Sequence, residues 1–439
     1  MLRTTLPAFA AVVVAVSLSY SCSAPTTPAD AQSDTAADTR SDLGPVVDAA
    51  ADIADASDEV DTSVAPDALD TGDDVLDSGV ARDVTVRDVV SRDTGGDSGV
   101  ASLDWYPGNY GVTNTANRTA RDAFLTGSIS SAFEGVEIVY PWTLCEGARG
   151  DYSACFAAID ADLDAAPAGK HVILFLQYKQ FGSGPGINAV PAYLRTGPGA
   201  HCVTSAGTQI CGEYTTANSV VAMIWNDAVA ARLRAWVAAV GAHYGPGGPG
   251  AARGSKIAGI VFPETATGED PMHPLASVGY TPMNYVAAIE GNLSAASAAF
   301  PTKPVFQYIN FIPHGVPSES AAMQSIGDWA LTQRNIGLGC PDVGGNSTFH
   351  PPGYNTLMNA AYQLHLPFNV AVENMDFDMA YTNSLDATYA EATGRAPDGM
   401  AAQFVVWMHV TAPGNVFTIN DVAAFLPTHP NPNTALPTY

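Results

Sequence analysis

The chain has 439 residues and a formal net charge of −26. Only 18 residues are Lys or Arg, against 44 that are Asp or Glu, and this balance argues against a protein that binds nucleic-acid phosphates through clustered cations. The chain is long enough, and with 47% hydrophobic residues apolar enough, to bury a sizeable core. The composition therefore favours a globular protein that binds neutral ligands.

The first 21 residues have the layout of a secretory signal peptide. Arg3 is followed by an apolar stretch from Leu6 to Leu18 and then by small residues before Cys22. This order resembles a bacterial lipobox, in which Cys22 would be acylated and become the mature N-terminus. An ordinary cleaved signal with an incidental Cys is the alternative. We expect an exported protein, held to a bacterial membrane by this lipid alone, in the periplasm or at the cell surface.

Residues 22–102 are predicted to form a disordered linker. Between Ser23 and Val100 there are 19 Asp or Glu against 4 Arg, and no Lys, Trp, Phe or Tyr. A segment with so much like charge and so few large apolar groups cannot offset the entropy cost of ordering. Its acidic runs lack the spacing of a calcium-binding loop, so a spacer is favoured over a calcium site. One globular domain is expected over residues 103–439.

Short apolar runs alternate with helical patterns along this domain. Runs that are continuously apolar are typical of parallel strands buried on both faces. An eighth strand is expected upstream of Val136, either within 104–112 or around residue 129. Helices are expected over 227–243 and after Thr281, which we predict to be an N-cap with Pro282 at the first helical position. The seven strands visible in the sequence are 136–140, 171–178, 257–263, 304–311, 336–340, 369–373 and 403–410.

The alternation of strands and helices predicts an α/β fold with a parallel sheet. Eight strands would close a (β/α)8 barrel of the TIM type. An open doubly wound sheet is the alternative, but the first strand-to-helix turn lacks the Gly-rich phosphate fingerprint of that fold. We therefore predict a (β/α)8 barrel preceded by the acidic linker.

Five cysteines follow the signal peptide and Cys22. In an oxidising compartment, Cys145 is expected to pair with Cys155 and Cys202 with Cys211, which leaves Cys340 unpaired. Neither pair has tight C-x-x-C spacing or a nearby His pair, so no metal site is predicted, and we expect no cofactor. The second bridge lies in the long excursion before the fourth strand, where we expect a disulfide-stapled flap over the active face.

Two glutamates directly follow apolar strands. Glu264 comes after the run ending at Pro263, and Glu373 comes after Val372. Parallel barrels carry their reactive groups at these carboxyl ends. Cleavage of a glycosidic bond needs two carboxyl groups, because one protonates the departing oxygen while the other attacks the sugar or activates water. Glu264 and Glu373 are therefore the candidate catalytic residues. Other strand-end residues are candidate sugar contacts, namely Trp142, Glu146, Gln177, Lys179, Asn310, Asp342 and Trp407.

The segment 142–152 reads WTLCEGARGDY. It resembles the W-x-x-x-E-P-x-x-G-x-Y segment of the retaining barrel glycoside hydrolases in the β-galactosidase and cellulase clan. Segments 159–163 and 168–174 also match the second helix and third strand of that clan. The resemblance implies an acid/base at the end of the fourth strand and a nucleophile at the end of the seventh, here Glu264 and Glu373. It also implies a sugar-stacking Trp407 on the eighth strand.

Three positions depart from the clan pattern. Gly147 stands where Pro is usual, and Pro263 stands where the clan places an Asn. On the sixth strand the usual aromatic residue is missing, and Asp342 follows instead as an alternative second carboxylate. Two functions therefore remain open: a glycoside hydrolase acting on a poly- or oligosaccharide, retaining or inverting, and a carbohydrate-binding barrel lipoprotein without catalysis. We expect a monomer in either case.

Overall fold

The computed structural model describes residues 102–182, 186–195, 202–205, 208–341, 343, 357, 366, 369–373, 384–394, 399–409 and 417–436. The signal peptide, Cys22 and the acidic linker lie outside these residues, and the statements made about them above stay predictions. Within the described part of the chain, no helix combines the length and the apolar character needed to cross a membrane.

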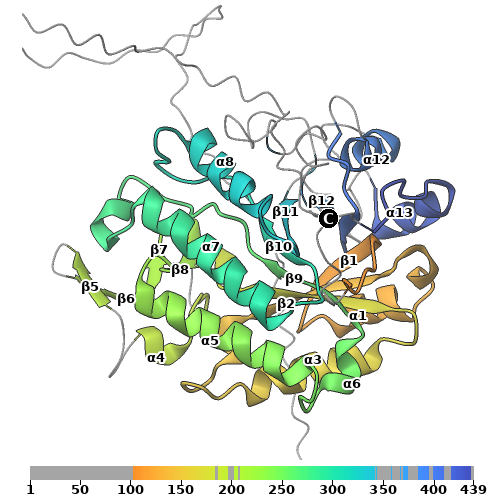
Figure 1. Ribbon diagram of the computed structural model, residues 1–439, viewed down its shortest axis with the longest axis horizontal. Helices are drawn as coiled ribbons and strands as arrows, with labels where there is room; N and C mark the ends of the chain where they lie inside the picture. The colour runs from red at the N-terminus through yellow and green to blue at the C-terminus, as the bar shows by residue number, and fades with distance from the viewer. Residues whose placement is uncertain are drawn as a thin grey trace, which may run out of the picture. The chain divides into compact units, whose positions relative to one another are not determined.

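Eight parallel strands close into a barrel in the order β1-β13-β12-β11-β10-β9-β3-β2 (Figure 1). This confirms the predicted (β/α)8 architecture. The first strand begins within the first of the two regions considered for it, whereas Ile129 precedes a short 3-10 turn. The strands are β1 (Gly108–Asn114), β2 (Gly135–Pro141), β3 (His171–Gln177), β9 (Ile257–Phe262), β10 (Val305–Tyr308), β11 (Ile336–Cys340), β12 (Asn369–Glu373) and β13 (Phe404–Met408).

Helices surround the barrel, and their ends follow local sequence signals. Thr281 caps α7 as expected, because its hydroxyl accepts from the Asn284 amide while the Asn284 side chain accepts from the Thr281 amide. The helices are α1 (Arg118–Leu125), α2 (Trp142–Cys145), α3 (Ser153–Ala165), α4 (Ala192–Arg195), α5 (Asp227–Tyr244), α6 (Ala251–Gly254), α7 (Pro282–Ala299), α8 (Glu319–Ala330), α12 (Leu385–Thr393) and α13 (Ile419–Phe425). Short 3-10 turns are η1 (Ser130–Ala132), η2 (Leu275–Val278) and η3 (Leu426–Thr428).

Two apolar cores lie on the two faces of the barrel wall. The outer core packs the strands against the helices. Successive strand residues point to opposite faces, so alternate positions fill the barrel interior. Gly339 leaves room there, because an added Cβ would overlap the ring of Tyr308. The interior core comprises Leu103, Tyr110, Val112, Val139, Ile173, Phe175, Ala258, Val261, Phe306, Tyr308, Phe404 and Val406.

Residues 102–107 cover the N-terminal end of the barrel. Trp105 packs edge-on against Phe404, with ring centroids 5.2 Å apart, and Tyr106 stacks on His171 at 3.6 Å. Phe404 and His171 are the first residues of β13 and β3. Leu103 joins the interior core. This plug closes the barrel at the end opposite to the carboxyl ends of the strands.

A chain that begins at Ser102 is expected to keep the melting temperature of the mature protein, because the plug is then complete and the removed linker cannot form a core. Starting instead at Gly108 should lower the melting temperature, since the plug rings are lost. Thermal unfolding followed by circular dichroism compares the two chains. Loss of cooperative unfolding on removal of residues 22–101 alone would contradict the expected boundary.

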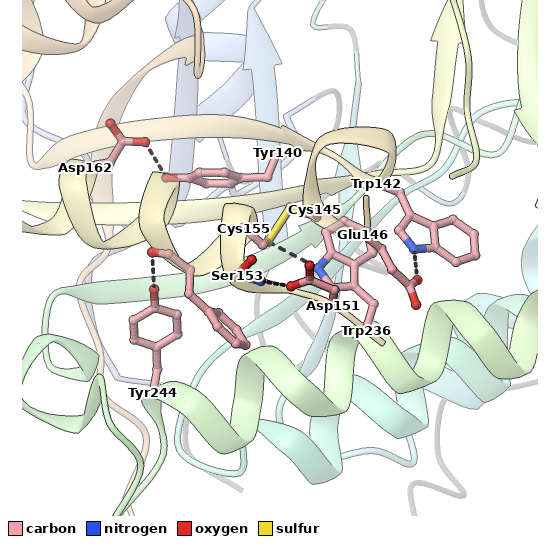
Figure 2. Close-up of a disulfide and its surroundings, with 11 residues drawn as sticks. Tyr140, Trp142, Cys145, Glu146, Asp151, Ser153, Cys155, Asp162, Trp236 and Tyr244 are labelled. Carbon is pink, nitrogen blue, oxygen red and sulfur yellow. Dashed lines mark hydrogen bonds between the residues drawn. A yellow bond between two sulfur atoms is a disulfide. The ribbon is translucent and has the colours of Figure 1, made fainter. Parts of the chain in front are cut away.

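Both predicted disulfides are confirmed. Cys145–Cys155 joins α2 to α3 (Figure 2). Cys202–Cys211 joins β5 (Cys202–Ser205) to β6 (Thr208–Cys211) in a hairpin. That hairpin belongs to the long excursion after β3, which also contains the antiparallel sheet β4 (Lys179–Phe181), β8 (Ser219–Ala222) and β7 (Glu213–Thr215). The hairpin lies against η2 in the loop after β9. That loop is on the carboxyl side of the barrel, and the cover over the active face stays a prediction.

Replacing Cys202 and Cys211 together with Ser is expected to lower the free energy of unfolding by roughly 2 kcal/mol, because the bridge closes a short loop in the unfolded chain. The barrel strands should be unaffected, since the bridge lies outside them. Chemical denaturation of the double variant and the wild type measures the difference. An unchanged unfolding midpoint would show that the bridge adds no stability.

Candidate active site

Glu264 lies just beyond β9, at the carboxyl end of the barrel. Its Oε1 is 3.7 Å from Nζ of Lys179 on β4, and its Oε2 accepts a hydrogen bond from Nδ2 of Asn310. The Glu264 side chain is 11% exposed and that of Lys179 only 2%. The structure thus brings together three of the predicted site residues, Glu264, Lys179 and Asn310. Of Glu264 and Lys179, Glu264 is the more exposed.

Burial and charge act on the Glu264 carboxyl in opposite directions. Desolvation raises its pKa, and the Lys179 ammonium lowers it by a smaller amount, so the pKa lies above its usual range. A larger fraction of Glu264 is therefore protonated near neutral pH than of a solvated glutamate. A partly exposed carboxyl that retains its proton can donate that proton to a departing oxygen.

Asn310 fixes the loop that carries Glu264. It lies two residues beyond the end of β10, and its side chain is nearly inaccessible. Its side-chain Oδ1 accepts a hydrogen bond of 2.8 Å from the backbone N–H of Ala266. Its backbone N–H donates a hydrogen bond of 3.1 Å to Oγ1 of Thr265. Asn310 therefore holds the carboxyl and the adjacent backbone at the same time.

Glu373 and Asp342 are the candidates for the second carboxylate. Glu373 ends β12 and lies in register with Trp407 of β13. The Glu373 side chain and the whole of Asp342 are outside the described residues. Both remain predictions for the second carboxylate.

Glu146 and Trp142 are buried in a hydrogen-bonded network after β2. Figure 2 shows the contact between their side chains. Trp142 Nε1 donates to Glu146 Oε2 at 2.9 Å, and the Gly150 amide donates to Glu146 Oε1 at 2.8 Å. Arg232 of α5 forms an ion pair with the same carboxylate. Trp142 stacks in parallel with Trp236 at 6.1 Å. Neither of these two expected sugar contacts has exposed surface. Arg232 supplies the counter-charge for the buried Glu146 carboxylate.

Trp407 also differs from its expected role. Its ring has no exposed surface and belongs to the outer core, where it stacks against Tyr389 of α12 at 6.1 Å. Its Nε1 donates to Oδ1 of Asn109 at 3.0 Å. The resemblance implies a ring face that is open to a sugar at this position. Here the ring packs against Tyr389, and its N–H is hydrogen-bonded to Asn109. Gln177, at the end of β3, is likewise buried, at 7% exposure.

Glu137 is a buried carboxyl that is not among the predicted residues. It lies on β2 two positions before the interior residue Val139, and its side chain is inaccessible. Tyr308 donates a hydrogen bond of 2.6 Å to its Oε2. Burial raises the pKa of Glu137 to about 7. The sequence signal for it is a single acidic residue within the apolar run GVEIVYP.

Among the residues that the structure describes, no three or more His, Cys, Asp or Glu side chains are grouped so as to hold a metal ion.

No protein-family model and no curated protein matches the chain. Among solved structures, GH5_18 from Streptomyces cattleya in complex with GlcNAc is 11% identical, with a TM-score of 0.35, over 70% of this chain and 71% of that one. An endo-β-1,4-xylanase of glycoside hydrolase family 10 from Gloeophyllum trabeum is 13% identical, with a TM-score of 0.40, over 69% and 84%. The catalytic domain of β-amylase from Paenibacillus polymyxa is 9% identical, with a TM-score of 0.44, over 70% and 93%. At these identities and TM-scores, none of the three similarities assigns a function to this chain.

Proposed function

We propose that this protein is a glycoside hydrolase that cleaves a poly- or oligosaccharide, with Glu264 as the proton donor. The observation that carries the proposal is the Glu264 carboxyl itself. It lies at the reactive end of a closed (β/α)8 barrel, it is partly exposed, and its pKa is raised by burial. The acidic composition agrees with a neutral substrate such as a sugar.

Proton donation by Glu264 would address the main difficulty of glycoside cleavage, which is the poor leaving ability of an alkoxide. The reaction also needs a second carboxylate, either as nucleophile or as base for water. Glu373 is proposed for that role because it ends β12 in the same barrel, and Asp342 is the alternative. Retention or inversion at the anomeric carbon, followed by NMR of the first product, would tell which of the two roles the second carboxylate performs.

We further propose that the protein is exported and held by a lipid on Cys22, which would place its substrate outside the inner membrane. Metabolic labelling with a radioactive fatty acid, in the wild type and in Cys22→Ser, tests the anchor. Label in the wild type alone supports lipidation, whereas equal signals in both would contradict it.

The function is tested by incubating the full mature chain with a panel of aryl glycosides and polysaccharides. Released reducing ends are measured beside equilibrium binding of the same sugars. Cleavage that requires Glu264 supports the proposal. Binding without cleavage, in a protein shown by circular dichroism to be folded, would favour the non-catalytic carbohydrate-binding barrel.

A further inference from the structure

The backbone after β9 is held by side chains and not by a neighbouring strand. The ladder between β9 and β10 ends at the pair Phe262 and Gln307. From there, five consecutive carbonyl groups each accept a hydrogen bond from a side chain of another element. The pairs are Pro263 with Gln307 at 2.5 Å, Glu264 with Lys179 at 2.9 Å, Thr265 with Tyr285 at 2.8 Å, Ala266 with Lys179 at 2.5 Å and Thr267 with Ser219 at 2.6 Å.

Lys179 makes two of these five contacts. Its Nζ donates to the carbonyls of Glu264 and Ala266, and it lies 3.7 Å from the Glu264 carboxyl. A buried ammonium is costly unless it is paired and hydrogen-bonded. These carbonyls, together with the carboxyl, satisfy that requirement. The same cation therefore touches the backbone and the side chain of the candidate acid.

Exposure separates the roles of the two partners. The side chain of Lys179 is 2% exposed, whereas that of Glu264 is 11% exposed. A sugar bound at the Glu264 carboxyl could not contact the Lys179 ammonium, because protein atoms already enclose it. The sequence predicts Lys179 to be a direct sugar contact, and its burial argues against that role.

We propose that Lys179 is a positioning residue for Glu264, whose ammonium fixes the 264–266 backbone and acts as the charge partner of the carboxyl without contacting substrate. The inference rests on the proposed function, in which Glu264 is the proton donor. In this role the Lys179 ammonium offsets part of the desolvation of Glu264, so that the carboxyl can lose its proton to a sugar oxygen and regain it.

Other groups close to Glu264 do not replace this charge. Asn310 is a neutral amide. Tyr285 donates its hydroxyl to the carbonyl of Thr265, and burial raises the pKa of Tyr285 well above its usual value, so the hydroxyl stays neutral. Among the described residues, Lys179 is the cation that acts on the pKa of Glu264.

The test is an infrared titration of the Glu264 carboxyl in the full mature chain, with the spectrum of Glu264→Gln subtracted as reference. In Lys179→Gln the charge is lost but an N–H donor remains, and in Lys179→Met both are lost. Removing an opposite charge at this distance should raise the pKa of Glu264 by about 1 to 3 pH units in either variant. Lys179→Arg keeps the charge and should leave the pKa close to that of the wild type.

This titration needs no turnover, so it is independent of whether the protein cleaves sugars. An unchanged pKa in a folded neutral variant would overturn the proposal. Failure of both neutral variants to fold, with Lys179→Arg folded, would also overturn it in favour of a purely structural cation. If sugars are cleaved, the alkaline limb of the pH profile of kcat/KM should shift to higher pH in Lys179→Gln. In Lys179→Arg it should lie close to its wild-type position. Absence of cleavage with the titration shift intact would sink the proposed function alone.

Discussion

Replacement of Glu264 by Gln is expected to lower kcat/KM on a polysaccharide by about 10² to 10⁴-fold, the usual contribution of a positioned general acid. Gln keeps the size of the side chain and can still pair with Asn310, but it cannot donate a proton as an acid. The loss should be smaller on an activated aryl glycoside, because that leaving group departs without protonation. Rates on both substrate classes, measured with the same enzyme preparations, provide the comparison.

A matched control is available at the other end of the barrel. Glu134 directly precedes β2, at the N-terminal end of the barrel. Its Oε1 lies 3.0 Å from Nδ1 of His171, within hydrogen-bond distance. Glu134→Gln makes the same chemical change away from the carboxyl ends of the strands and should retain wild-type rates. Equal activity in wild type and Glu264→Gln would remove Glu264 from the mechanism.

Glu373→Gln distinguishes the roles of the two proposed carboxylates. If Glu373 is the nucleophile, the variant should lose activity on activated and natural substrates alike, because no covalent glycosyl-enzyme can form. Retained activity in this variant would exclude Glu373 as the second carboxylate and favour Asp342.

Replacement of Glu137 by Gln is expected to stabilise the protein at pH 8 by about 3 kcal/mol and to have little effect at pH 4. Burial raises the pKa of Glu137 from its ordinary value of 4.5 to about 7. Between these two values the unfolded chain releases the proton while the folded chain retains it. The contribution of Glu137 to stability is therefore complete below pH 4.5 and is lost as the pH rises to about 7. Gln is neutral at every pH and can still accept the Tyr308 hydrogen bond.

Urea denaturation of the wild type and Glu137→Gln, at pH values from 4 to 8, measures this effect as a difference, so the other titrating groups largely cancel. Tyr308→Phe provides a second variant. The Tyr308 hydrogen bond lowers the pKa of Glu137, so its loss should extend the decline in stability to higher pH. A difference between Glu137→Gln and wild type that does not change with pH would rule out a buried, neutral Glu137.

The fold was largely predictable because its main signals are local. Buried parallel strands are continuously apolar, so most strand positions followed from the sequence. The Thr281 cap and both disulfides also depend on residues close together in the chain. The strand expected over 304–311 ends earlier, at Tyr308, because beyond it the side chain of Asn310 binds the loop after β9 and replaces the strand ladder.

The site was only partly predictable because exposure depends on distant partners. The position of Glu264 at the carboxyl end of the barrel followed from its place after a strand. The burial of Glu146 depends on Arg232, which is 86 residues away in the chain, and the burial of Trp407 depends on Tyr389 of a different element. Strand ends alone cannot distinguish a residue that faces a cleft from one that a helix covers.

The plug formed by residues 102–107 also sets the direction in which the protein can be attached to a solid support. The chain enters the barrel through this closed end, so any support joined ahead of Ser102 attaches on the side away from Glu264. Immobilisation through the N-terminus should therefore leave the carboxyl end of the barrel facing the solution, where a large polysaccharide of the proposed kind could approach it. Coupling through residues of the β9–α7 loop would turn that end toward the support, and under the proposed function it should reduce the cleavage of polysaccharides more than that of small glycosides.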